Sequence, residues 1–367
     1  MVDVVEFVKR FGREPTHGAT ARGRVNLIGE HTDYNGGFVL PAQIPLATRV
    51  QLAPRPDREV HICSAALPAD GVRHYTVGVE RRGRGWLDYV QGVTATLGAA
   101  GFALGGFDAT ITSDLPVGAG LASSAALVIA LLRALRADFG LALDDVQLAI
   151  AGQRAESEFV GARVGIMDQL VASIGVEGTA CFIDTRGPLY RNVPLPPDAA
   201  LAVIDSGLRH QHASGDYNAR RSECEQAAAL LGVAQLRDLN TADLPRLLAL
   251  PEPLRRRARH VISENARVLE AVAAIEAGDL ARLGALFDAS HASQRDDYDV
   301  SLPAIDRLVT LARAQPGVYG ARLTGGGWGG AVLVLARAGA ARPAAERAVA
   351  RLAGEGGPAA TVLLPFG

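Results

Sequence analysis

The sequence predicts an α+β protein of two domains. The chain has 367 residues, of which 49% are hydrophobic and 21% charged, and this is enough apolar material for two ordinary cores. The first half opens with short strand-like segments, whereas the second half is mostly helical and later contains two strand-like segments. Residues 191–199 contain three prolines and are expected to link the halves. The expected domains are therefore residues 1–192 and residues 200–367.

The first domain is expected to contain both strands and helices. Period-2 patterns between Gly and Pro residues predict strands at residues 38–40, 48–53, 60–63, 107–113 and 180–184. Helical periodicity predicts helices at residues 3–11, 86–100, 122–139, 144–159 and 167–174. A strand thus leads into a glycine-rich loop that opens a helix, which is the arrangement of many anion-binding loops.

The second domain is expected to combine one sheet with several helices. Residues 201–205 resemble a strand, and residues 217–232 and 254–314 are mostly helical by period and composition. Residues 318–335 resemble two strands joined by a glycine turn. No internal repeat interrupts this pattern.

Charge and composition exclude several classes of protein. The formal net charge of −2 gives no overall attraction to nucleic acid or to an anionic membrane. The cysteines Cys63, Cys181 and Cys224 form no C-x-x-C pair, so neither a disulfide framework nor a zinc knuckle is indicated. No apolar run reaches the roughly 20 residues of a membrane span, and the start lacks a signal-peptide pattern. A cytoplasmic protein, monomeric or weakly dimeric, is expected.

The basic residues are almost all arginine, and Lys9 is the only lysine. A Walker-A loop, a protein kinase and a pyridoxal enzyme each need a lysine in a defined context. Lys9 lies in a short helix without a neighbouring glycine-rich loop, so it supplies none of them. Any phosphate must be bound by other groups.

Polar side chains are concentrated in residues 23–37, a segment that glycines flank and interrupt. Glu30, His31 and Asp33 could present several donors and acceptors from one loop that Asn26 holds, as recognition of sugar hydroxyls requires. A solvated hairpin with a turn at residues 35–36 is the simpler alternative.

Residues 115–126 form a loop of small residues between a predicted strand and a predicted helix. Its backbone amides and the helix N-terminus could cradle phosphate without a lysine. Ser123 and Ser124 could add hydroxyl donors, or a ligand to Mg²⁺, which prefers oxygen. A serine N-cap after a Pro-Gly loop is the plain alternative.

Two further segments carry candidate residues. Asp168, at the start of a predicted helix, has the position of a base, and Glu156 that of a metal ligand, although caps and solvated acids are common there. Residues 323–330 contain five glycines, which indicate close backbone approach or simply a long hairpin.

Taken together, these segments resemble the galactokinase family of the GHMP small-molecule kinases. Residues 23–33 resemble the galactokinase signature, residues 116–125 the phosphate motif of the superfamily, and residues 324–330 its third motif. The resemblance extends to residues 86–92 and 214–221 and covers the whole chain in order. It implies a domain resembling the second domain of ribosomal protein S5, then a ferredoxin-like domain, with the active site in the cleft between them.

The resemblance also implies a reaction and a set of site residues. The reaction is the ATP-dependent phosphorylation of galactose at O1, the first step of galactose catabolism, with Mg²⁺ as cofactor. Asp168 is expected to accept the hydroxyl proton and Arg24 to steady the developing charge, unless Asp168 only orients the hydroxyl. The remaining residues implied for galactose are Glu30, His31, Asp33, Gly165 and Tyr217; for ATP, Gly118, Ala119, Gly120, Leu121, Ala122, Ser123, Ser124 and Trp86; for the third motif, Gly325, Gly326 and Gly327; and for Mg²⁺, Ser124 and Glu156.

Three positions depart from the family pattern. Ala122 shortens the serine run, Val164 stands where relatives often carry cysteine, and Trp328 replaces a more usual phenylalanine. None of these removes a reacting group. The alternatives are a kinase of N-acetylgalactosamine, arabinose or galacturonate, a sensor that binds galactose and ATP without catalysis, and a glycosidase that uses Glu30 and Asp33.

Overall fold

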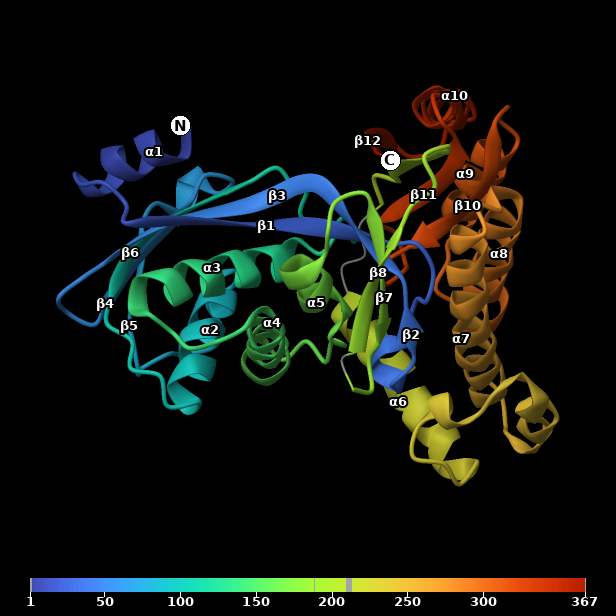
Figure 1. Cartoon of the computed structure of the whole chain (residues 1–367), viewed down its shortest axis with the longest axis horizontal. Coiled ribbons are helices and arrows are strands. Elements are labelled where there is room, and N and C mark those ends of the chain that lie inside the picture. Colours follow the sequence, from blue (N-terminus) through green and yellow to red (C-terminus); the bar gives the residue numbers. More distant parts are fainter. Residues whose placement is uncertain (1, 188, 209–212, 367) are drawn as a thin grey trace. The chain divides into compact units, whose positions relative to one another are not determined.

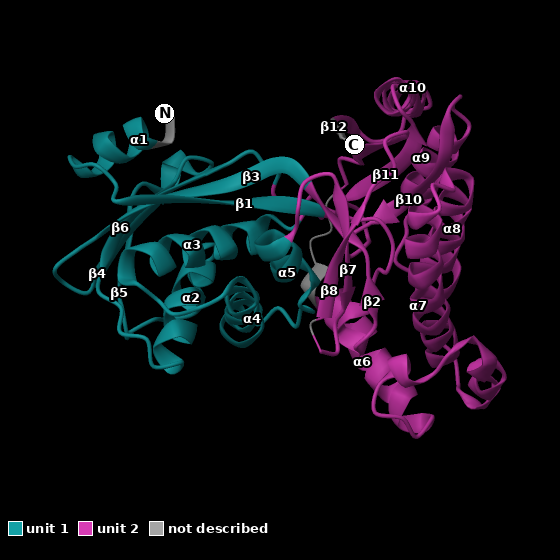
Figure 2. Cartoon of the chain, in the orientation of Figure 1, with its two compact units in different colours: residues 1–24, 44–116, 122–174 teal, residues 25–43, 117–121, 175–367 magenta. Residues whose placement is uncertain are grey.

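A computed structural model describes residues 2–187, 189–208 and 213–366 of the chain (Figure 1). They form two compact units, each assembled from separate stretches of sequence (Figure 2). Unit 1 comprises residues 1–24, 44–116 and 122–174, and unit 2 comprises residues 25–43, 117–121 and 175–367. The chain therefore passes between the units several times before residue 175.

Unit 1 contains a five-stranded stretch of sheet. Its strands are β1 (His17–Asn26), β3 (Pro41–Pro54), β4 (Glu59–Ser64), β5 (Arg73–Thr76) and β6 (Phe107–Ser113), and the ends of β1 and β3 continue into unit 2. The order is β1-β3-β6-β4-β5, in which β4 and β6 are parallel while β3 and β6, and β4 and β5, are antiparallel. Strand β1 was not expected from the sequence.

The helices of unit 1 complete its core. They are α1 (Val2–Phe11), α2 (Leu87–Ala99), α3 (Ser123–Phe139), α4 (Asp145–Arg154), which continues as a π-helix (Ala155–Val160), and α5 (Met167–Ile174), with a 3-10 turn at Pro68–Asp70. A capping box between Asp144 and Gln147 begins α4. Apolar side chains of α2 and α3, such as Val90 and Leu131, belong to one buried cluster with Leu52 and Phe107 of the sheet.

Unit 2 contains a four-stranded antiparallel sheet. Its strands are β9 (Ala199–Asp205), β10 (Val318–Thr324), β11 (Ala331–Arg337) and β12 (Thr361–Phe366), in the order β10-β11-β9-β12. Numbered along the chain, this order is 2-3-1-4, which is that of a ferredoxin-like sheet. The expected ferredoxin-like second half is therefore present. A smaller group of strands in the same unit consists of β2 (Phe38–Val39), β7 (Thr179–Asp184) and β8 (Leu189–Pro194).

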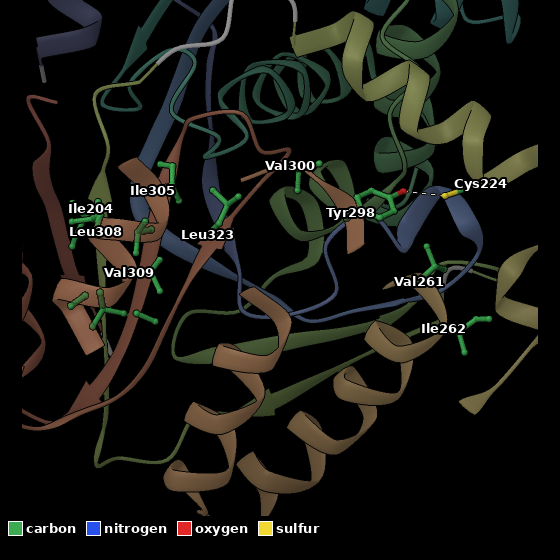
Figure 3. Close-up of a cluster of buried hydrophobic side chains, with 14 of the residues drawn as sticks. Ile204, Cys224, Val261, Ile262, Tyr298, Val300, Ile305, Leu308, Val309 and Leu323 are labelled. Atoms are coloured by element: carbon green, nitrogen blue, oxygen red, sulfur yellow. Dashed lines mark hydrogen bonds between the residues drawn. The ribbon is translucent and has the colours of Figure 1, made fainter. Parts of the chain in front are cut away.

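Helices and short turns join the strands of unit 2. The α-helices are α6 (Ala213–Leu230), α7 (Leu254–Glu276), α8 (Leu280–Ser293), α9 (Pro303–Arg313) and α10 (Ala341–Gly354). The 3-10 helices are Asp33–Asn35, Leu236–Asp238 and Thr241–Ala249, and Gln294–Tyr298 is a π-helix. Figure 3 shows the core that they form, with Ile204 of β9, Leu323 of β10, Val261 of α7 and Leu308 of α9 in one buried cluster. Tyr298 is a fully buried member of the same cluster.

The expected and observed elements agree for most of the chain. The strand at 107–113 and the helix at 167–174 have the expected limits. Of residues 191–199, expected as a linker, residues 191–194 belong to β8, which pairs with β7, and residues 195–198 connect β8 to β9. The domain limits 1–192 and 200–367 stay a prediction, while the compact units interleave in sequence. Within the described ranges, no helix is both long and apolar enough to cross a bilayer.

Candidate active site

Arg24 and Asp168 form a two-pronged ion pair in unit 1. Arg24 is at the end of β1, and its Nε and Nη2 atoms donate hydrogen bonds of 2.8 and 2.7 Å to the Oδ1 and Oδ2 atoms of Asp168. The arginine side chain is buried, whereas 28% of the Asp168 side chain is exposed, so a ligand can reach the carboxylate. Bidentate pairing fixes the plane of a carboxylate as well as its position. Asp168 thus offers a carboxylate of fixed orientation, and its role as a proton acceptor stays a prediction.

Ser124 and Glu156, the two residues predicted to bind magnesium, are in contact in unit 1. Glu156 lies in the π-helix, is buried, and accepts hydrogen bonds from the Ser124 hydroxyl and from Nε2 of Gln169, the latter at 2.7 Å. Burial raises the pKa of Glu156 to about 7, and the charge of Asp168 adds to the shift while the two hydrogen bonds oppose it.

The Ser124–Glu156 pair fits a magnesium ion. Both side chains offer oxygen, and Mg²⁺ is usually held by one or two protein oxygens while it keeps several waters. The Oε1 atom of Gln169 is buried beside them without a hydrogen-bond partner. Among the residues with described positions, no group of three or more His, Cys, Asp or Glu side chains is arranged to hold a metal. A hydrated ion with few protein ligands suits this set better than a closed metal cage.

The predicted phosphate loop has an unusual backbone. Gly118 and Gly120 have φ angles of +75°, and Ala122, the residue before α3, has φ +59°. Positive φ is rare for a residue with a Cβ atom and tends to occur where function requires it. Ala122 has no side chain that could cap α3, so the amides of the first helical turn, at Ser123 and Ser124, are not occupied by that residue.

The third glycine motif packs against the phosphate loop within unit 2. A Cβ atom on Gly325 would lie 3.1 Å from the carbonyl oxygen of Gly120, and one on Gly330 would lie 3.4 Å from that of Ala119. Gly325 also has φ +91°. Both packing and backbone conformation therefore favour glycine at Gly325. The glycines of this motif form the turn between β10 and β11, so the segment is also the long hairpin that was the simpler alternative for residues 323–330.

Glu30 joins the signature loop to the third motif. Its Oε2 atom accepts hydrogen bonds from Asn26 Nδ2 at 2.8 Å and Arg322 Nη2 at 2.6 Å, and Oε1 accepts one from the Gly325 amide at 2.9 Å. The Thr324 hydroxyl lies 3.1 Å from Oε1. The carboxylate is buried and surrounded by protein donors. Its contact with a sugar stays a prediction, and its contact with the protein is extensive.

His31 belongs to a chain of hydrogen bonds in unit 2. Its Nε2 atom is 3.2 Å from the carbonyl oxygen of Gly326, so Nε2 carries the proton and donates it. Nδ1 therefore accepts from the Tyr34 hydroxyl at 2.8 Å, and that oxygen accepts from Tyr298 at 2.7 Å. Tyr298 in turn accepts from the Cys224 thiol at 3.0 Å (Figure 3). Burial lowers the pKa of His31 to about 3, which keeps the ring neutral.

The remaining predicted residues are divided between the units. In unit 2, the half-buried Tyr217 has its ring centroid 5.4 Å from that of His31, and Asp33 begins the turn Asp33–Asn35. In unit 1, Gly165 lies in the loop before α5, and Trp86 donates from Nε1 to Asp70 at 2.8 Å. Trp86 also packs beside the core of unit 1, as a helix anchor would. Its role in binding adenine stays a prediction.

Sequence reasoning missed several residues that shape these contacts. Gln169 holds Glu156, Arg322 holds Glu30, and Tyr298 continues the chain from His31 through Tyr34. Arg322 is an arginine inside an otherwise apolar strand, and this was a visible signal of a buried partner. The sequence gives no comparable signal for Gln169 or Tyr298, because glutamine and tyrosine occur in helices and turns without any functional role.

Comparison with known proteins identifies three family models along the chain. The galactokinase galactose-binding signature matches residues 5–54, the N-terminal domain of GHMP kinases matches residues 88–176, and their C-terminal domain matches residues 271–354. Their order is that of the motifs described above.

Relatives of known name cover nearly the whole chain. A galactokinase of Roseiflexus sp. is 47% identical over 91% of this chain and 88% of its own length, and one of Chloroflexus aurantiacus is 46% identical over 90% and 87%. The crystal structure of Lactococcus lactis galactokinase complexed with galactose matches with a TM-score of 0.94 and 31% identity, over 99% of this chain and 96% of that one.

Proposed function

Because the chain belongs to the galactokinase family of the GHMP kinases, we propose that it transfers the γ-phosphoryl group of ATP to the O1 hydroxyl of α-D-galactose, giving galactose 1-phosphate and ADP. The bidentate Arg24–Asp168 pair is the observation that carries this proposal. It gives a reachable carboxylate of fixed orientation, as a proton acceptor for a sugar hydroxyl needs. The Lactococcus lactis relative was crystallised with galactose, which supports the choice of sugar.

The chain's own residues then divide the work of phosphoryl transfer. Asp168 takes the O1 proton or orients the hydroxyl toward phosphorus, and Arg24 steadies the charge that develops there. Positioning dominates such reactions, and aligned intramolecular groups gain up to about 7–11 kcal/mol in model systems. Glu30, His31, Asp33, Gly165 and Tyr217 are proposed to surround the sugar.

The phosphates are proposed to lie along residues 118–124. Backbone amides of the loop and of the first turn of α3 point positive partial charge at an anion, so that no lysine is needed. In the third motif of Gly325, Gly326 and Gly327, Gly325 packs against this loop. Gly326 lies nearest to Tyr217, and Gly327 lies nearest to Val300. Ser124 and Glu156 would hold Mg²⁺, which neutralises charge on the phosphate oxygens during transfer. Trp86 is proposed to contribute to the adenine pocket.

An ADP-release assay on purified protein tests the function. Galactose, N-acetylgalactosamine, arabinose and galacturonate are compared at equal concentration with MgATP. The highest kcat/KM is expected with galactose. A preference for another sugar would make the chain a related sugar 1-kinase, and no sugar-dependent ADP release from folded protein that binds both ligands would make it a sensor.

A cytoplasmic location and a monomeric or weakly dimeric state are also proposed. The three cysteines are free and buried, which suits a reducing compartment. Sedimentation at several protein concentrations measures the oligomeric state directly.

A further inference from the structure

Gln169 stands out as a buried polar side chain that is only half satisfied. It follows Asp168 in α5 and is 1% exposed. Its Nε2 atom donates a 2.7 Å hydrogen bond to Oε1 of Glu156, but its Oε1 atom is buried without a partner. An unsatisfied buried carbonyl costs stability, so its retention calls for a reason.

The surroundings of Gln169 supply a reason. The Glu156 carboxylate accepts hydrogen bonds from two side chains, the Ser124 hydroxyl in the first turn of α3 and the Gln169 amide in α5. These contacts hold the carboxylate in one orientation without any metal. Groups that hydrogen-bond to a metal ligand in this way typically matter for affinity by about 10- to 100-fold.

The short helix α5 serves two groups at once. Asp168 reaches Arg24 with its carboxylate, and the next residue, Gln169, reaches Glu156. The proton acceptor and the support of the predicted metal ligand are therefore consecutive residues on one rigid element. Any shift of α5 would move both together.

We propose that Gln169 is a positioning residue for the magnesium site, an inference that rests on the proposed function. Its amide N–H orients Glu156, and its unpaired carbonyl oxygen would accept a hydrogen bond from a water of a hydrated ion held there. Magnesium keeps several waters, and a fixed acceptor at the protein wall stabilises one of them. A bound hydrated ion would thereby satisfy the unpaired oxygen.

Metal binding without turnover tests this role. Free Mn²⁺ is measured by electron paramagnetic resonance while Mn²⁺ is added to protein saturated with ADP, with ADP alone as the blank. Gln169→Met keeps the length of the side chain but removes both amide groups. It is expected to weaken Mn²⁺ binding about 10- to 100-fold, while ADP binding in EDTA and galactose binding stay unchanged.

Two further variants make the test specific. Gln169→Asn keeps the amide but shortens it, disturbs the packing less, and is expected to weaken Mn²⁺ binding as well. Gln153→Met is the matched control, because Gln153 is a partly buried glutamine of the same unit that donates to Ser157 and Val164 rather than to Glu156. Its Mn²⁺ affinity is expected to equal that of the wild type.

The outcomes separate this inference from the proposed function. Folded Gln169 variants that bind Mn²⁺ within twofold of the wild type, while Glu156→Gln loses it, would overturn the positioning role. An inactive wild type that still binds Mn²⁺ with ADP would count against the kinase activity alone, because no turnover enters the binding measurement.

Discussion

Arg322 donates a 2.6 Å hydrogen bond from Nη2 to Oε2 of Glu30, and both side chains are almost completely buried in unit 2. The same guanidinium donates from Nη1 to the carbonyl oxygen of Leu27 at 2.7 Å. Strand β10 thus holds both the backbone and the acid of the signature loop. An arginine without exposure to water is retained only where its partners are fixed, and here they are residues of the candidate site.

Removing this arginine is expected to be costly. Arg322→Met leaves the Glu30 carboxylate buried without its cation, and the free energy of unfolding should fall by about 3–5 kcal/mol. Arg307→Met is the control, because Arg307 makes a comparable two-pronged pair with Glu355 at the surface, and its loss should cost about 1 kcal/mol or less. Urea unfolding of both variants measures the difference. Equal losses would contradict the importance of the buried pair.

Asp168→Asn is expected to separate the two roles considered for Asp168. The amide keeps one hydrogen bond to Arg24 but cannot take a proton, so a true base predicts a fall in kcat of about 10²- to 10⁴-fold with the fold retained. Glu158→Gln is the control, because Glu158 is an exposed acid of the same unit. Steady-state kinetics and thermal unfolding are measured together. A loss of less than tenfold would favour a purely orienting role.

Stability is expected to fall in mild acid because two buried histidines must stay neutral. Burial lowers the pKa of His31 to about 3 and that of His260 to about 4, below the usual 6.5. As the pH falls, each histidine therefore binds a proton at a higher pH in the unfolded chain than in the folded protein. The stability that is present above pH 6.5 is lost as the pH falls toward 4, at about 1.4 kcal/mol per pH unit for each histidine.

Glu156 opposes this trend over part of the range. Its pKa is raised to about 7, so the folded state holds a proton that the unfolded state releases above about pH 4.5, and the stability it contributes is lost as the pH rises through 7. Unfolding midpoints between pH 4 and 8 are compared for the wild type, His260→Gln and Glu156→Gln. The acid slope should be shallower in the first variant and steeper in the second; identical slopes would contradict the assignment.

The contact between the third motif and the phosphate loop gives a matched pair of glycine variants. Gly325→Ala meets both an unfavourable φ of +91° and the Gly120 carbonyl oxygen 3.1 Å away, whereas Gly140→Ala meets a φ of +62° but no neighbouring atom within 4 Å. Each should lose about 1 kcal/mol from the backbone alone. Only Gly325→Ala is expected to raise the KM for ATP, measured at saturating galactose. An unchanged KM would mean that the loop does not depend on the third motif.

The elements of the fold were largely predictable because hydrophobic period and glycine punctuation are local. Helix 167–174 and strand 107–113 were read at their actual limits. Strand β1 was missed since His17–Asn26 is rich in Gly, Ala and Arg and buries only its last residues strongly. Residues 191–194 of the expected linker belong to β8, because proline is tolerated at the end of a strand that lies at the edge of a sheet.

The candidate site was predictable as a set of motifs but not as a set of contacts. The pairing of Ser124 with Glu156, and of Arg24 with Asp168, joins residues far apart in sequence, while the roles expected for them stay predictions. The positive φ angles of His31, Ala122 and Trp328, which all lie in the predicted motifs, carry no composition signal. The hydrogen-bond partners Gln169 and Arg322 likewise follow only from tertiary packing.

The interleaving of the two units in sequence limits how the protein can be divided. A gene fragment that ends at residue 174 would encode the signature loop without β10, and hence Glu30 without Arg322. The complementary fragment would carry the four-stranded sheet without residues 117–121, which lie against its hairpin. Neither piece is a natural module for domain exchange, so hybrid enzymes assembled from relatives should keep these distant segments from one parent.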